Sequence, residues 1–360
     1  MCIIAFYFDC SYRYVVSPVS ICYHEIRGYF SLFYTDMDIS RRDFLKNIFK
    51  LGSAAAAAGA LSSLSACDQE TPPSASKSGQ ETTPVATPPP PGTAYLAVAR
   101  GKTPEAITRA AIEALGGMKR FVKKGDDVII KPNICTDYHT YEYAATTNPE
   151  VVGALVKLCL AAGAGRVRVM DKPFGGTAEK AYERSGIAEA IEAAGGEMEI
   201  MSNIKYREAV IPDGRDITRW TVYGDALDAD VLINVPIAKH HSLGRLTLGM
   251  KNLLGLVKNP AQFHFNLGQR LADLTSLLRP ELTVVDAVRI LTNHGPTGGN
   301  LNDVKLTNTV IASHDIVAAD TYATSLFGLT GDDVPAIRAA VPMGLGTTDL
   351  ESVKVVEIDV

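Results

Sequence analysis

Polar and charged residues follow several apolar segments of this chain, and they are of types that bind anionic groups or metal ions. Lysine supplies a point charge with three donors, and asparagine supplies both donors and acceptors. The ends of parallel strands meet at one edge of a sheet, where ligands bind in open α/β folds. The candidates for a shared ligand site at such an edge are Lys131, Asn133, Asp171, Lys239, Lys251, Asn252, Asp286, Gly295 and Gly298. The alternative is a set of separate caps, because an Asp after a strand often closes the following turn.

Histidines near the same segments are the candidate metal ligands, since neutral imidazole binds many metals. They are His240, His241, His264 and His294. Adjacent strand residues point to opposite faces, so at most one of His240 and His241 would reach a common site. Each ring could instead be hydrogen-bonded to backbone. The glycine-rich loop 293–299 could bind an anion through its N–H groups, but it matches no known phosphate-binding fingerprint and could be a plain turn.

Cysteines restrict the cofactor chemistry. Only Cys135 and Cys159 lie in the part of the chain that reads as folded, and no C-x-x-C motif occurs. The chain's own cysteines therefore predict neither an iron–sulfur cluster nor a structural zinc site. Cys135 and Cys159 could form a disulfide, whereas the apolar surroundings of Cys159 favour a buried thiol. No Ser-His-Asp or Cys-His nucleophile arrangement is evident from the spacing.

Strand-like and helix-like segments alternate from residue 93 onward, which predicts an α/β fold with a mostly parallel sheet covered by helices on both faces. The expected strands are 95–99, 127–130, 166–170, 197–201, 231–235, 282–285, 308–311 and 353–356. The expected helices are 103–121, 148–163, 177–194, 246–256, 267–278, 316–327 and 334–340. A small β insert is predicted at 208–223. The domain is taken as 93–360, with two subdomains possible, divided near 225–230.

The N-terminal part of the sequence predicts that the protein is exported and contributes no candidate site residues. Residues 37–67 resemble a twin-arginine signal, with Arg41 and Arg42, followed by a lipoprotein cleavage box that ends at Cys67. The apolar stretch 51–66 is shorter than the roughly 20 residues that a membrane span requires. Residues 1–36 lie upstream of Met37 and are interpreted as a doubtful extension. Residues 68–92 are rich in Pro, Ser and Thr and predict a tether.

These features predict a protein exported to the periplasmic side of the cell envelope. Its expected partners are the twin-arginine export machinery and the membrane, which it would reach through a lipid on Cys67. The chain holds 35 Lys and Arg against 40 Asp and Glu, a net charge of −5, without a basic run. Nucleic acid is therefore not an expected partner.

Several short motifs together resemble the family known as domain of unknown function 362. They are KPN at 131–133, TNPEVV at 147–152, DADV at 228–231, PIAKH at 236–240, MKNLLG at 250–255 and GP at 295–296. The resemblance extends over most of residues 131–327. It implies no established activity. Many members carry a ferredoxin-like cysteine-rich segment, and this chain lacks one.

Two functions follow as hypotheses. The first is a redox-associated enzyme that depends on a metal ion or an anionic cofactor, because twin-arginine export moves folded proteins that often carry a cofactor. The second is a non-catalytic binding or accessory protein that serves a redox or metal-handling complex, which would make a redox protein its partner. The sequence does not define the cofactor, the substrate or the oligomeric state.

Overall fold

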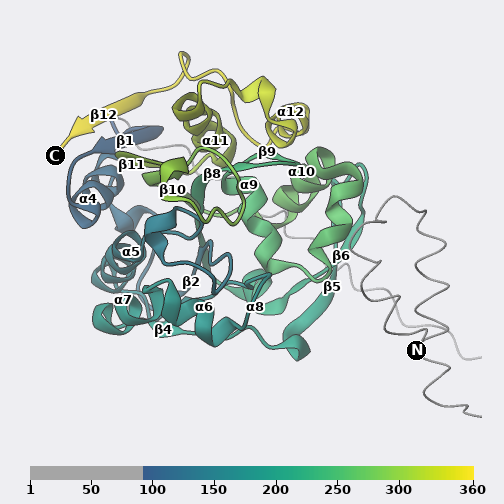
Figure 1. The fold of residues 1–360 in the computed structure, drawn as a ribbon, viewed down its shortest axis with the longest axis horizontal. Helices are drawn as coiled ribbons and strands as arrows, with labels where there is room; N and C mark the ends of the chain where they lie inside the picture. The colour runs from purple at the N-terminus through teal and green to yellow at the C-terminus, as the bar shows by residue number, and fades with distance from the viewer. Residues whose placement is uncertain (1–91) are drawn as a thin grey trace, which may run out of the picture. The chain divides into compact units, whose positions relative to one another are not determined.

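A computed structural model describes residues 92–360, which are organised around one ten-stranded sheet (Figure 1). The predicted extension 1–36, the signal 37–67 with Arg41, Arg42 and Cys67, and all of the tether except Gly92 lie outside the described residues. The sheet contains strands from both sides of residues 225–230, and β2 pairs with β7 across that point of the chain.

The sheet is mostly parallel, as predicted. Along its main path the strand order is β12-β1-β11-β10-β7-β2-β3-β4, and β8 and β9 extend it beside β10. Only β11 in that path runs against its neighbours β1 and β10. The strands are β1 (Leu96–Arg100), β2 (Asp127–Pro132), β3 (Arg166–Val169), β4 (Glu197–Met198), β7 (Val231–Val235), β8 (Ile237–His241), β9 (Arg245–Thr247), β10 (Leu282–Leu291), β11 (Val304–Ser313) and β12 (Val355–Asp359).

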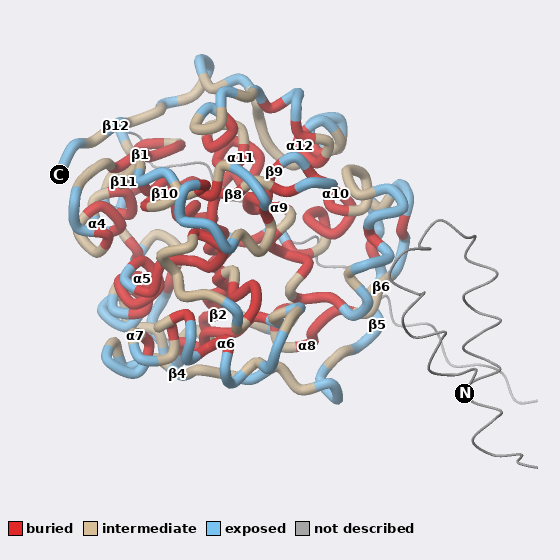
Figure 2. The backbone as a smooth tube through the Cα atoms, viewed as in Figure 1, coloured by how far each residue is buried: buried red, intermediate tan, exposed pale blue. Residues whose placement is uncertain are grey.

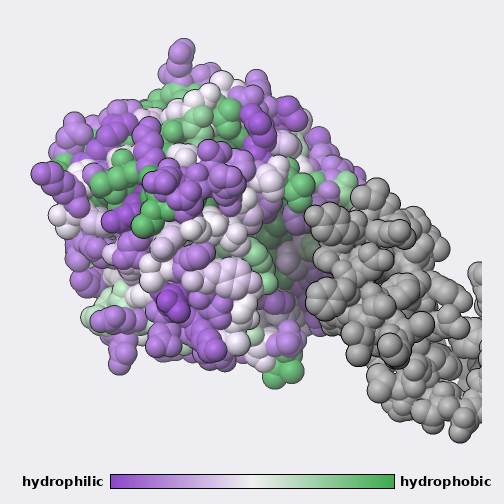
Figure 3. Space-filling view, in the orientation of Figure 1, coloured by the Kyte–Doolittle hydropathy of each residue, from purple (hydrophilic) through white to green (hydrophobic). Residues whose placement is uncertain are grey.

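Helices cover both faces of the sheet, so the fold class is α/β. One face packs against α4 (Pro104–Ala114), α5 (Pro149–Ala162), α6 (Ala178–Arg184) and α7 (Ile187–Ala194). The other face packs against α8 (Gly224–Asp228), α9 (Gly249–Asn252), α10 (Leu267–Leu278), α11 (Ile316–Thr324) and α12 (Pro335–Ala340). Figure 2 shows the buried residues concentrated between these layers, and Figure 3 shows a largely hydrophilic surface in the same view. Within residues 92–360, no helix combines the length and apolarity needed to cross a bilayer.

Short 3-10 turns connect many of these elements. They are η1 (Met118–Arg120), η2 (Tyr141–Tyr143), η3 (Asn203–Lys205), η4 (Leu253–Leu256), η5 (Pro260–Asn266), η6 (Leu301–Asp303), η7 (Ser325–Phe327), η8 (Gly331–Asp333) and η9 (Val341–Met343).

Two apolar layers explain why the central strands contain continuous Val and Ile residues. Ile129 of β2 packs into one core, whereas its neighbours Val128 and Ile130 pack into the other. A strand covered on both faces has no solvated side, so it shows no polar alternation. Four residues of such strands are all fully buried: Ile129 of β2, Val169 of β3, Ile233 of β7 and Val284 of β10.

Helix ends follow local sequence signals closely. The Asn148 side chain accepts a hydrogen bond from Glu150 N at the start of α5, and Pro149 occupies the first turn. Gly163, with φ 109°, ends the same helix in the left-handed region that glycine tolerates best. The range of α10 matches the expected helix 267–278.

The region from Ile237 to Leu256 differs from the prediction. The strand predicted at 231–235 is β7 and ends at Val235, because Pro236 has no N–H to continue the ladder. Lys239 lies not at the end of that strand but inside a further strand that was not predicted. A separate strand, β8, then pairs parallel with β10 and antiparallel with β9. The helix expected at 246–256 starts only at Gly249, since Leu246 and Thr247 belong to β9.

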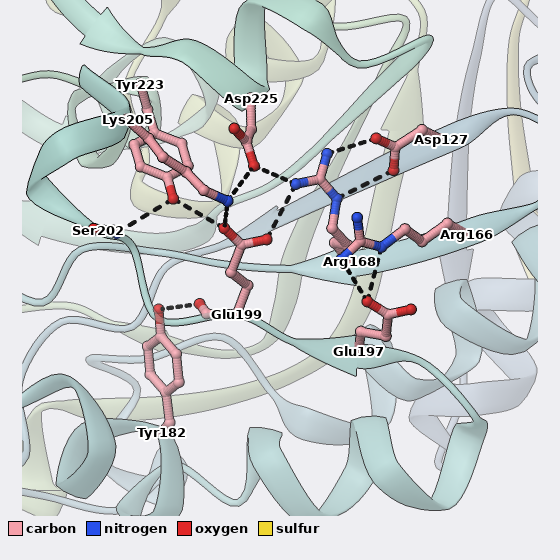
Figure 4. Close-up of polar contacts among 10 residues, drawn as sticks. All are labelled: Asp127, Arg166, Arg168, Tyr182, Glu197, Glu199, Ser202, Lys205, Tyr223 and Asp225. Atoms are coloured by element: carbon pink, nitrogen blue, oxygen red, sulfur yellow. Dashed lines mark hydrogen bonds and ion pairs between the residues drawn. The ribbon is translucent and has the colours of Figure 1, made fainter.

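The predicted insert forms a separate two-stranded antiparallel sheet, β5 (Tyr206–Val210) and β6 (Arg219–Tyr223). An ion-pair network joins the chain beside it to β3 (Figure 4). The nearly buried Arg168 guanidinium lies 2.6 Å from Asp127 and 3.1 Å from Glu199, and it also contacts Asp225. Lys205 binds the latter two carboxylates. The network places the insert against the strand that leads to Asp171.

Asp320 of α11 provides a test of how α9 is held. Its buried carboxylate accepts hydrogen bonds from Gly249 N at 2.6 Å and Met250 N at 3.0 Å. Replacement Asp320→Ala leaves both donors unsatisfied, and we expect the free energy of unfolding to fall by about 1–3 kcal/mol. Urea denaturation measures this. The exposed Asp332 offers the control Asp332→Ala, expected to change stability by less than about 0.5 kcal/mol. Equal effects of the two replacements would contradict this account.

Candidate functional site

A buried ion pair lies where β2 and β3 end. Lys131 Nζ is 2.7 Å from Asp171 Oδ1, and the two side chains are 0% and 4% exposed. The same ammonium donates to Asn252 Oδ1 at 2.9 Å and to Pro132 O at 3.0 Å. Burial lowers the pKa of Lys131, and the Asp171 carboxylate opposes that shift. Each of the two charges therefore compensates the other, and either one would be very costly to bury alone.

Three asparagine side chains connect this pair to the neighbouring elements. Asn252 Oδ1 accepts from Asn133 Nδ2 at 2.9 Å, in addition to the lysine. Asn252 Nδ2 donates to Lys131 O at 3.1 Å and to Asn234 Oδ1 at 2.9 Å. Asn234 Nδ2 in turn donates to Gly249 O at 2.9 Å. These bonds fix α9 against β2 and β7.

A second lysine joins the network from β8. Lys239 Nζ donates to Asn133 Oδ1 at 2.9 Å and to Ala145 O at 2.6 Å. The side chain is almost completely buried, and burial lowers the pKa of Lys239. Asn133 therefore bridges the parts of the site that carry Lys131 and Lys239. Hydrogen bonds and the ion pair thus bring together the side chains of Lys131, Asn133, Asp171, Lys239 and Asn252.

Lys251 is the third lysine and differs from the other two in its contacts. Among residues 92–360, its ammonium group forms no hydrogen bond and no ion pair. Burial, and then the nearby charge of Lys239, lower the pKa of Lys251 to about 8. We refer to Lys131, Lys239, Lys251 and Asp171 as the lysine cluster. In the described part of the chain, Asp171 is the only carboxylate that forms an ion pair with any of these three lysines.

His241 lies beside the cluster and is neutral. Its Nδ1 accepts hydrogen bonds from Leu243 N at 3.1 Å and Gly244 N at 3.2 Å. Burial lowers the pKa of His241 to about 3, and the charges of Lys251 and Lys239 act in the same direction. Because Nδ1 is an acceptor, the ring proton resides on Nε2.

Cys135 is a buried free thiol at the same edge. Its Sγ lies 3.4 Å from Pro296 O in the glycine-rich loop. Burial raises the pKa of the Cys135 thiol, and the neighbouring Lys239 opposes this shift. Cys159 is also free and buried, so the predicted alternative of a Cys135–Cys159 disulfide is not formed.

The predicted glycine-rich loop packs against β8. Gly295 N donates to His240 Nδ1 at 3.2 Å, and a Cβ atom on Gly295 would lie only 1.8 Å from His240 O. The Gly295–Pro296 peptide is cis. Gly298 has φ 64°, and its N–H binds His294 O. Gly295 is therefore required for close backbone packing, and Gly298 for a turn.

Gly255 is a part of the site that the sequence reading missed. A Cβ atom there would lie 2.0 Å from Asp171 Oδ1 and 2.6 Å from Lys131 Nζ. The backbone of η4 thus covers the ion pair without a side chain. Asn234 and Cys135 were also missed as site residues. A single amide within the apolar segment 231–235 was the available signal for Asn234.

Asp286 was predicted at a strand end and lies instead inside β10. The strand continues to Leu291 because it pairs with β11 over that length. The Asp286 carboxylate accepts from Asn148 N at 2.7 Å and Val288 N at 3.0 Å. Burial raises the pKa of Asp286 to about 6. These contacts give it a structural role at the start of α5, outside the lysine cluster.

The four candidate histidines have separate hydrogen-bond partners. His264 Nδ1 lies 3.0 Å from Ala261 O, and His294 Nδ1 lies 2.8 Å from Asp303 Oδ2. His240 and His241 accept backbone hydrogen bonds through Nδ1, and the ring centroids of His241 and His264 are 6.4 Å apart. Across the described range 92–360, no group of three or more His, Cys, Asp or Glu side chains could hold a metal ion.

The family follows from comparison with known proteins. The model of the family described as "Domain of unknown function (DUF362)" matches residues 128–325. A thylakoid-associated protein of Synechocystis sp. is 32% identical over 255 residues, which cover 68% of this chain and 77% of that protein. This chain therefore belongs to the domain of unknown function 362 family, as its motifs predicted.

Two solved structures show a looser likeness. The lactate racemase apoprotein from Thermoanaerobacterium thermosaccharolyticum gives a TM-score of 0.42 at 10% identity, covering 64% of this chain and 56% of that one. A protein from Thermotoga maritima gives 0.39 at 13% identity, covering 63% and 60%. The chain thus spans less than two thirds of either structure, and likeness at this level supports no functional argument.

The buried ion pair can be tested by a double-mutant cycle. Lys131→Met leaves the Asp171 carboxylate buried without its cation, and we expect a loss of about 3–5 kcal/mol in the free energy of unfolding. Adding Asp171→Asn to that variant should restore part of the loss, because the amide removes the unpaired charge. Urea denaturation of Lys131→Met, of Asp171→Asn alone and of the double variant completes the cycle. Additive losses in the double variant would show that the two charges do not interact.

Proposed function

We propose that the protein binds a small anionic molecule at the lysine cluster, through Lys239 and Lys251. The observation that supports this most directly is the excess of positive charge. Three buried or mostly buried lysines lie together, and only Lys131 has a carboxylate ion-pair partner within residues 92–360. A buried charge without a partner is costly, and an anion between the two remaining ammonium groups would stabilise both.

An anionic substrate or cofactor agrees with this site better than a metal ion does. Ammonium groups repel cations, and lysine offers a metal no lone pair while it is protonated. A lysine with a pKa near the working pH is also suited to exchange protons with a bound molecule. We therefore favour an enzyme that acts on, or with, a small anion.

A non-catalytic binding protein is the second candidate. The amide network around Asn252 is supported by many hydrogen bonds and holds the cluster rigidly, which binding alone also requires. A redox or metal-handling partner is part of this second hypothesis and rests on the predicted export signal. Turnover of a bound anion by the purified protein would distinguish the enzyme from the accessory protein.

Anion binding can be measured by calorimetry with oxalate and with inorganic phosphate. We expect Lys239→Met and Lys251→Met each to weaken binding by about tenfold or more, since each removes a charged contact worth about 1.5–3 kcal/mol. Lys258→Met is the matched control, because Lys258 is exposed on the same stretch of chain. Unchanged affinity in both cluster variants would refute the proposed site, and circular dichroism of each variant verifies folding.

The affinity should also depend on pH. An anion favours protonated Lys251, so binding remains strong while the pH is below the pKa of about 8 and weakens as the pH rises through it. Arginine keeps its charge throughout this range. We expect Lys251→Arg to remove much of the weakening between about pH 7.5 and 9.5. The same pH profile in both proteins would exclude Lys251 as the titrating group.

We also propose that the folded domain is exported and held at the membrane by a lipid on Cys67. A relative described as thylakoid-associated supports a membrane-associated location. The basis for the proposal remains the sequence of residues 37–67.

Fractionation of the native host tests the location. Replacing both arginines, Arg41→Lys and Arg42→Lys, should retain the precursor in the cytoplasm, because lysine lacks the planar guanidinium fork. Cys67→Ala should remove the protein from the lipid-modified fraction, since the acyl chains attach to that thiol. Normal export of the double-lysine variant would contradict the twin-arginine route.

A further inference from the structure

An open cleft of about 520 Å³ lies at the edge of the sheet opposite to the lysine cluster. Its wall includes Asp126 just before β2, Asp230 just before β7 and Glu281 just before β10, so it lies where these parallel strands begin. The lysine cluster lies where β2 and β3 end. Small-molecule sites in proteins usually occupy roughly 300–1,000 Å³. The cleft is therefore large enough to admit a ligand, and it is separate from the site described above.

Arg120 of η1 brings a guanidinium with few internal contacts to this cleft. Its Nη1 donates to Leu115 O at 2.9 Å, and its Cζ lies 4.9 Å from the centre of the Phe121 ring. Within residues 92–360 this guanidinium forms no ion pair, so most of its N–H groups have no protein acceptor. Burial lowers the pKa of Arg120, because its charged form is disfavoured there. A carboxylate bound by two parallel hydrogen bonds would offset that cost.

The other charged groups of the cleft limit the charge of its ligand. Three acidic and three basic side chains line it: Asp126, Asp230, Glu281, Arg120, Lys123 and Arg279. Each of the three carboxylates already accepts a backbone hydrogen bond of 2.7 to 2.8 Å. Arg279 differs from Arg120 in having a carboxylate, that of Asp213, 3.8 Å from its Nη2. The acids repel a ligand with several negative charges, whereas a single carboxylate can pair with Arg120.

Apolar side chains and a neutral histidine form much of the remaining wall. Phe121, Ile316 and Leu345 line the cleft together with His314. Burial, and then the charge of Arg120, lower the pKa of His314 to about 4, so its ring is neutral near pH 7. Ligand pockets typically combine such an apolar lining with a few polar groups that fix the orientation of the ligand. This wall therefore suits an apolar ligand body beside the charged end.

We propose that this cleft is a second binding site, for a small organic monocarboxylate with an apolar body, whose carboxylate binds Arg120. The guanidinium supplies the charged contact, and the wall around Phe121 and Leu345 covers the apolar body. The proposal does not depend on the lysine cluster, because the two sites lie at opposite edges of the sheet and share no residue. No bond is made or broken in this step.

Calorimetry of the purified full-length protein with phenylacetate tests the site. We expect 2-phenylethanol, which has the same ring but no carboxylate, to bind at least about tenfold more weakly, since it loses a charge-assisted contact. Inorganic phosphate, which has no apolar body, should not compete with phenylacetate. Arg120→Met should weaken the binding of phenylacetate at least about tenfold. Arg219→Met is the matched control, because Arg219 is exposed on the separate two-stranded sheet, and it should leave the affinity unchanged.

Further variants distinguish the cleft from the lysine cluster. Leu345→Trp narrows the cleft without removing a charge and should also weaken the binding of phenylacetate, which keeps the test decisive if Arg120→Met does not fold. Lys239→Met and Lys251→Met should leave that affinity unchanged. Binding that is lost in the lysine variants and retained in Arg120→Met would overturn the second site and support the lysine cluster. Equal affinity for 2-phenylethanol, or no binding of phenylacetate to protein shown by circular dichroism to be folded, would also overturn it.

Discussion

The buried pairing of Lys131 with Asp171 is the interaction on which the arrangement of the site depends. Neither charge can be left alone at this depth, so the ends of β2 and β3 must stay in register. Asn252 shares the same lysine and thereby ties α9 to the sheet. The close approach of Gly255 completes the enclosure, because any side chain there would occupy the position of the ion pair. One electrostatic requirement therefore sets the position of several elements.

The same constraint explains the chemistry of the remaining lysines. Asp171 is bound to Lys131 and to Ile134 N, so it offers little further compensation to its neighbours. Lys239 is held by neutral acceptors, and Lys251 has no acceptor within the described chain. The lysine cluster therefore carries excess positive charge, because its one carboxylate, that of Asp171, is already paired with Lys131. It is also why the pKa of Lys251 decreases, since burial and Lys239 both disfavour its proton.

Much of the fold could be predicted from sequence, because buried parallel strands can be recognised by their continuous Val and Ile residues. The ends of α5 and α10 also follow local capping and periodicity signals. The errors occur where pairing is non-local. β8 and β9 are short strands defined by each other and by β10, and Asp286 lies within β10 because β11 extends that strand. The expectation that polar residues at strand ends meet at one edge of the sheet selected Lys131, Asn133 and Asp171. It missed Asn234 and Gly255, whose roles arise only when α9 and η4 pack onto the sheet.

The hydrogen bonds already formed in the cluster determine which side chains hold its geometry and which remain available to a ligand. Asn133, Asn234 and Asn252 donate and accept among themselves and with the lysines, so they cannot change partners without a cost of about 1–3 kcal/mol per lost bond. They can hold geometry, but they are poorly suited to follow a reaction. Lys251 forms no such hydrogen bond within residues 92–360, and its stem packs closely against Gly244. A rigid frame of amides around one lysine without a hydrogen bond suits the binding of an anion, because the groups that position the ligand are fixed before it arrives.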